Sequence, residues 1–86
     1  QAYERMRDYL QLSYETYQDG FYEVSREALV EAEVFEDRWL RQKQPAVTEA
    51  RKRAAASSID KLERALERRE PGALNRFKDA AARLFE

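Results

Sequence analysis

The chain has 86 residues, of which 38% are charged and 43% hydrophobic, and its formal net charge at pH 7 is −1. Two glycines and two prolines are too few for a loop-rich fold or a flexible linker, and the hydrophobic content is too high for a disordered chain. No apolar run approaches the roughly 18–20 residues that cross a bilayer, so we expect a soluble chain without a membrane span.

A chain of this length forms one domain, residues 1–86, with a thin core. Because it begins at Gln1 rather than Met, we expect a processed chain or part of a longer protein. No targeting segment is visible, and the sequence therefore leaves the localisation open.

The sequence contains no histidine and no cysteine. Histidine is the commonest general base and the commonest transition-metal ligand, so serine and cysteine nucleophile systems and zinc sites of the usual kinds are excluded. Carboxylates four residues apart remain, as at Glu27 and Glu31 or Glu33 and Asp37, but on a helix surface that looks solvated. We therefore expect no enzyme, no catalytic residue, no cofactor and no metal site.

Turn signals at Asp19-Gly20, Pro45 and Pro71-Gly72 divide the chain into segments rich in helix-forming residues. Within each segment apolar residues recur at spacings of three and four, which is the pattern of an amphipathic helix. The predicted helices span about 2–18, 21–43, 46–70 and 73–85.

The predicted buried stripes follow in chain order. The first contains Tyr3, Met6, Leu10, Tyr14 and Tyr17. The second contains Phe21, Val24, Ala28, Ala32, Phe35 and Trp39. The third contains Val47, Ala50, Ala54, Ser58, Leu62 and Ala65, and the last Leu74, Phe77, Ala81, Leu84 and Phe85. These stripes predict an all-α fold, a small antiparallel bundle of four helices in which the second and third form a long central hairpin. An extended three-helix arrangement with a loosely attached last helix is the alternative.

One set of positions is spaced like a single tetratricopeptide hairpin: Leu12, Ser13, Gly20, Tyr22, Ser25, Leu29 and Ala32. A repeat array would recur with a period of 34 residues, but Ala54, Ala56 and Glu63 stand where Gly20, Tyr22 and Leu29 should recur. We therefore assign no family.

Four positions are candidates for binding a protein partner. Val30 and Val34 lie one turn apart on the side of the second helix opposite its predicted stripe, among charged residues. Leu12 lies opposite the stripe of the first helix, and Tyr9 is the aromatic ring most displaced from that stripe. Exposed tyrosines and paired apolar residues on a polar face are typical of interaction surfaces, although single surface valines are common.

Charge is distributed unevenly along the chain. Residues 1–43 carry six Lys or Arg against ten Asp or Glu, whereas residues 44–86 carry ten against seven. We expect the acidic second helix to face the basic third, or two copies to pair head to tail. The basic residues also suggest an alternative, a nucleic-acid-associated regulator whose phosphate contacts come from Arg51, Lys52, Arg53, Arg68 and Arg69. Consecutive helical residues point about 100° apart, so the basic triplet forms no stripe.

The sequence favours a non-catalytic interaction or assembly module, working by self-association or as a small helical subunit of a larger complex. The expected partner is a protein or a second copy, with nucleic acid as the alternative.

Overall fold

The computed structural model describes residues 1–42 and 49–69, and over these residues it contains three α-helices and no strand. They are α1, Ala2–Gln18, α2, Tyr22–Arg41, and α3, Glu49–Arg68. The all-α class is confirmed, and α1 has the predicted bounds. The described part of the chain forms three helices rather than four, because the predicted fourth helix at 73–85 lies outside it, as do the break at Pro45 and the start of the predicted third helix.

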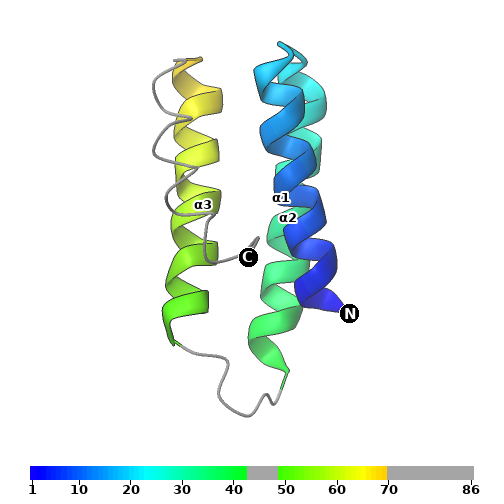
Figure 1. The fold of residues 1–86 in the computed structure, drawn as a ribbon, viewed down its shortest axis with the longest axis vertical. Coiled ribbons are helices and arrows are strands. Elements are labelled where there is room, and N and C mark those ends of the chain that lie inside the picture. Colours follow the sequence, from blue (N-terminus) through cyan, green and yellow to red (C-terminus); the bar gives the residue numbers. More distant parts are fainter. Residues whose placement is uncertain (43–48, 70–86) are drawn as a thin grey trace.

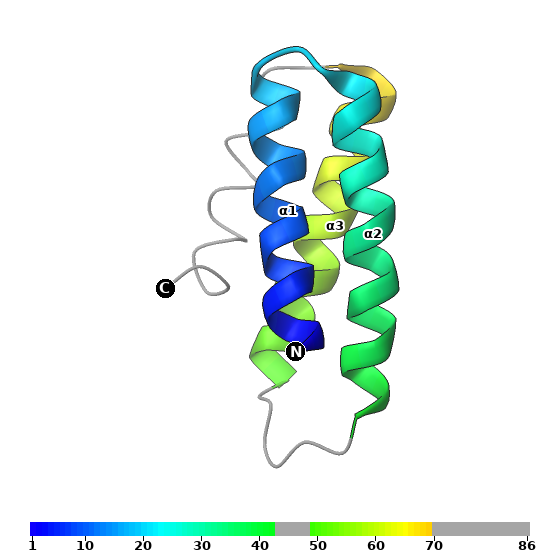
Figure 2. The ribbon, with the colours of Figure 1, turned by 90° about the vertical axis from the view of Figure 1, so that its right-hand side faces the viewer.

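The three helices run alternately up and down. α1 and α2 lie side by side, and α3 packs against one face of this pair (Figure 1). In Figure 2, α3 lies behind the pair. α2 and α3 run antiparallel, as predicted for the central hairpin, but the most extensive packing is between α1 and α2. The core of the described bundle is thus a tight α1–α2 hairpin onto which α3 is laid.

A Schellman motif ends α1 and turns the chain into α2. The Gly20 N–H donates to the Tyr17 carbonyl at 3.0 Å, and the Phe21 N–H donates to the Thr16 carbonyl at 2.9 Å. This pair of bonds requires a left-handed residue at the turn, and Gly20 supplies it with φ of +85°. The Asp19-Gly20 turn signal therefore has a direct structural cause.

Two buried serines join α1 and α2 by reciprocal hydrogen bonds. The Ser13 hydroxyl donates to the Ser25 carbonyl at 2.8 Å, and the Ser25 hydroxyl donates to the Ser13 carbonyl at 2.7 Å. Both side chains are fully buried. Because the bonds reach backbone carbonyls, they require the two helix backbones to lie close together, which small side chains such as Ala28 and Ala32 permit.

The buried face of α2 is rotated from the predicted stripe. Phe21 and Val24 were predicted to be buried but are 62% and 45% exposed. Ser25 lies in the interface instead, together with Leu29, which flanks the predicted stripe. The serine pair explains the difference, since it turns the Ser25 side of α2 towards α1 and so moves Val24 to the flank.

Aromatic contacts tie α3 to both ends of the hairpin. At one end the Tyr17 hydroxyl donates to the Ala65 carbonyl at 2.9 Å, and the Tyr17 ring meets Tyr22 edge-on at 5.1 Å. At the other end Tyr3 packs on buried Trp39 at 5.1 Å, and Arg51 of α3 lies over the Tyr3 ring. Between these ends α3 buries a row of mostly small and aliphatic side chains: Ala54, Ala55, Ser58, Ile59, Leu62, Ala65 and Leu66.

Replacing Gly20 should test the turn. A β-carbon at position 20 meets no atom within 4 Å, so the Gly20→Ala cost comes from backbone conformation alone. We expect a loss of about 1–2 kcal/mol in the free energy of unfolding, measured by urea denaturation. Gly20→Asn is the matched control and should lose less, because asparagine tolerates the left-handed region better. Equal losses for both variants would contradict this account.

Replacing Ser25 by an apolar residue, smaller or larger, should destabilise the α1–α2 hairpin. Ser25→Ala removes one buried hydrogen bond and should cost about 1 kcal/mol. Ser25→Leu overfills the interface and should cost more, with overpacking alone contributing about 1–3 kcal/mol. Urea denaturation followed by circular dichroism measures both, and a Leu variant as stable as the wild type would show that the helices do not need this close approach.

Candidate functional site

The candidate interaction surface lies on the outer side of α2. Val30 and Val34 are 52% and 42% exposed and stand one helical turn apart. We call these two residues the valine stripe. They lie on the far side of α2 from the buried Ser25 and Ala32, so the hairpin contact does not use them. The structure confirms the predicted exposure of the pair.

Carboxylates surround the valine stripe. Glu27, Glu31 and Glu33 lie three or four residues from one of the valines, and therefore within one turn of it. None of the three forms an ion pair with another residue in the described part of the chain. Asp37, on the same side, pairs with Arg41 at 3.3 Å. Arg26 and Arg38 stand four residues from Val30 and Val34 respectively, so the rim of the valine stripe is mixed in charge but carries more carboxylates than cations.

Glu33 also reaches across to α3. Its carboxyl hydrogen-bonds the carboxyl of Glu63, and this bond, with partial burial and the charges of Glu63 and Glu36, raises the pKa of Glu33 to about 7. Burial, with the charges of Asp37 and Glu63, also raises the pKa of Glu36 above its ordinary value. Near neutral pH, Glu33 is therefore partly protonated.

This contact differs from the predicted charge pairing of α2 and α3. We expected opposite charges to meet there, but Glu33 and Glu63 bring like charges together. The ion pairs Arg41–Asp37, Lys52–Glu49 and Arg64–Asp60 each join two exposed residues of a single helix. Such pairs contribute about 0–1 kcal/mol each and do not orient one helix against another.

The two candidates on α1 differ in exposure. Leu12 is 43% exposed, as predicted for a residue opposite the buried stripe. Tyr9 was expected to be the most exposed ring, but it is half-buried and stacks on Phe35 of α2 at 5.8 Å with nearly parallel planes. Among the aromatic rings of residues 1–42, the exposed one is Phe21. Tyr9 and Leu12 line a small surface hollow of about 240 Å³ together with Arg5 and Asp8.

The five basic candidates on α3 do not gather on one face. Arg51 lies over Tyr3 of α1, whereas Lys52 pairs with Glu49 on its own helix at 3.5 Å. Arg69 follows the end of α3 and its guanidinium lies 5.0 Å from the centre of the Tyr22 ring. Arg53 and Arg68 are exposed. These residues point to different neighbours, so they do not form a continuous basic track.

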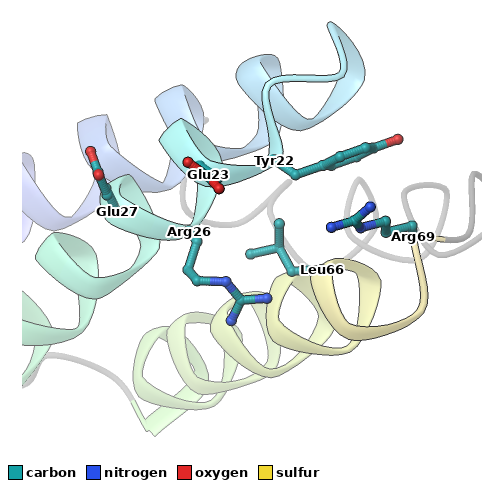
Figure 3. A pocket seen from close by; sticks show the side chains of 6 residues that line it. All are labelled: Tyr22, Glu23, Arg26, Glu27, Leu66 and Arg69. Carbon is teal, nitrogen blue, oxygen red and sulfur yellow. The ribbon is translucent and has the colours of Figure 1, made fainter.

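A hollow of about 320 Å³ opens between the start of α2 and the end of α3. Figure 3 shows the Tyr22 ring above Arg69, with the Arg26 guanidinium extending beside Leu66. Glu23 and Glu27 complete the lining. Four of its six lining residues are charged, whereas small-molecule pockets are lined mainly by apolar side chains, so the hollow lacks the character of such a pocket.

Neither a metal site nor a membrane span is found in the part of the chain that the structure describes. No group of three or more acidic residues there is arranged to hold a metal ion, although Glu33, Glu36 and Glu63 approach one another. None of the described helices combines the length and the apolar character that a membrane span requires.

Comparison of the chain with protein-family models, curated proteins and solved structures found no match.

The sequence reasoning missed the carboxyl contact between α2 and α3. It considered Glu33 only with Asp37, on one helix. A signal was present in the spacing Ser25, Leu29, Ala32, Glu36 and Trp39, because Glu36 occupies a position that the pattern of threes and fours assigns to the helix interface. A charged residue at such a position indicates either a buried ionic contact or a functional site.

The Glu33–Glu63 contact predicts that stability depends on pH. The folded chain binds the Glu33 proton more tightly than the unfolded chain, so the stabilisation is fully present below about pH 4.5 and is lost as the pH rises through about 7. Glu33→Gln should remove this decline between pH 5 and 8 and stabilise the protein at pH 8 by about 0.5–1 kcal/mol. Thermal unfolding at several pH values is the measurement. Glu31→Gln, on the exposed side of α2, should keep the wild-type slope, and an unchanged slope for Glu33→Gln would refute the assignment.

Proposed function

We propose that this domain is a non-catalytic protein–protein interaction or assembly module that acts through the outer side of α2, by self-association or as a small helical subunit of a larger complex. The observation that carries the proposal is the exposure of Val30 and Val34, in register and one turn apart. Packing within the described hairpin does not require them, because the buried face of α2 is formed by other residues.

The absence of histidine and cysteine from the whole chain supports a binding role over catalysis. The short length of the chain supports it as well, since a domain of this size has a thin core to whose stability a partner can contribute. The amphipathic pattern of 73–85 supports a fourth helix within the same module.

A protein partner is favoured over nucleic acid. Phosphate binding needs several cations on one face, whereas Arg51 and Arg69 each lie over a tyrosine of another helix and Lys52 pairs with Glu49. The outer side of α2 carries carboxylates, which repel phosphates.

Changing the valine stripe should disrupt assembly without unfolding the domain. Val30→Asp together with Val34→Asp places charge in the proposed interface, and we expect self-association, or affinity for the complex, to weaken by at least about tenfold. Light scattering after size exclusion across a wide concentration range measures self-association, and circular dichroism checks helicity.

Val24→Asp is the matched control. Val24 is also exposed but lies about 120° around α2 from Val30 and about 80° from Val34. It should therefore leave assembly unchanged. Equal effects of the two changes, or none from the valine-stripe pair, would remove this surface from the proposed function.

A further inference from the structure

The valine stripe is too small to hold a partner by apolar contact alone. Its two side chains are already about half covered by the rest of α2, so docking removes little additional apolar surface from water. Association must also offset the lost translational and rotational freedom of the two molecules. The groups around the valines must therefore contribute, and these are mostly acidic.

Pairing of two α2 helices does not suit this rim. An antiparallel pairing that sets Val30 of one copy against Val34 of the other sets Glu27 against Asp37, Glu31 against Glu33 and Arg26 against Arg38, and opposite charges meet only where Glu23 faces Arg41. A parallel pairing in register sets each carboxylate against itself. Both arrangements bring like charges together, which is destabilising.

A cationic partner satisfies the same groups. Glu27, Glu31 and Glu33 have no ion-pair partner among the described residues. Glu27 precedes Val30 along the helix, and Glu31 and Glu33 lie between Val30 and Val34. Lysine and arginine side chains are long enough to lie along apolar surface while their charged ends reach carboxylates at its edge. Apolar residues at helical spacing then contact the valines.

Resting on the function proposed above, we propose that the valine stripe docks a basic amphipathic helix of a partner protein, whose apolar residues cover Val30 and Val34 and whose lysine or arginine side chains pair with Glu27, Glu31 and Glu33. The partner lies along α2, on a side that neither α1 nor α3 occupies (Figure 2).

Glu33 should make the affinity of this docking depend on pH, which attraction between the net charges of the two partners does not explain. The carboxyls acting on Glu33 are Glu63 of α3 and Glu36 of α2, and a cation at the rim favours the ionised form of Glu33. Docking therefore releases the Glu33 proton, and affinity should increase as the pH rises from about 6 to about 8 through the pKa of Glu33, about 7.

The experiment measures binding of three synthetic helices to the full chain by fluorescence anisotropy. Each has about eighteen residues with leucine at spacings of three and four. The remaining positions are all lysine in the first peptide, all glutamine in the second and all glutamate in the third. We expect the lysine peptide to bind at least about tenfold more tightly than the glutamine peptide and the glutamate peptide to bind least. Raising the salt from about 50 to about 200 mM should weaken the lysine peptide's binding.

Three variants locate the contact. Val30→Gln with Val34→Gln keeps the charge and the helix propensity and should weaken binding of the lysine peptide by at least about tenfold, whereas Val24→Gln should not. Glu33→Gln should abolish the rise in affinity with pH. Circular dichroism at both pH values confirms that each variant remains folded.

The outcomes separate this inference from the proposed function. Preferred binding of the glutamate or glutamine peptide, with dependence on the valines, overturns the basic partner but retains the interaction surface. Self-association through the valine stripe with no peptide binding also overturns the basic partner and retains the interaction surface. Binding of the lysine peptide that ignores the valine changes overturns the inference, because it then reports only net charge. No peptide binding and no self-association overturn both.

Discussion

The reciprocal bonds between Ser13 and Ser25 fix how α1 and α2 pack, and the rest of the described structure depends on that packing. Each hydroxyl reaches the backbone of the other helix, so the helices are held at one distance and in one register. In that register Tyr3 meets Trp39 at one end and Tyr17 meets Tyr22 at the other. Tyr3 and Tyr17 in turn contact α3, through Arg51 and the Ala65 carbonyl, at the two ends of its buried row. The same register directs the valine stripe outwards.

Periodicity predicted the helices well because each helix is decided locally. The bounds of α1 follow from the 3.6-residue pattern and from a turn in which Gly20 adopts a conformation that other residues avoid. The rotation of α2 was not predictable in the same way. Phe21 and Val24 are more hydrophobic than Ser25, and only the position of Ser13 on another helix explains why the serine is buried instead.

In the candidate site too, features of a single helix could be predicted and contacts between helices could not. Val30 and Val34 could be found from the sequence because their contrast with neighbouring charges is a property of one helix. The Glu33–Glu63 contact could not, since it joins residues of two helices whose relative rotation the sequence leaves open. The predicted exposure of Tyr9 was wrong for a related reason. Its ring is displaced from the stripe of α1 but stacks on Phe35 of the neighbouring helix.

The attachment of α3 has a consequence for how the chain folds. The turn at Gly20 joins α1 to α2, so their contacts link residues near in sequence, whereas the Tyr17–Ala65 bond closes a far longer loop. Short loops close with less loss of entropy, and the hairpin can therefore assemble before α3 joins it. Because α3 makes fewer contacts with the pair than the pair makes within itself, its amide protons should exchange with solvent through openings that leave the hairpin intact.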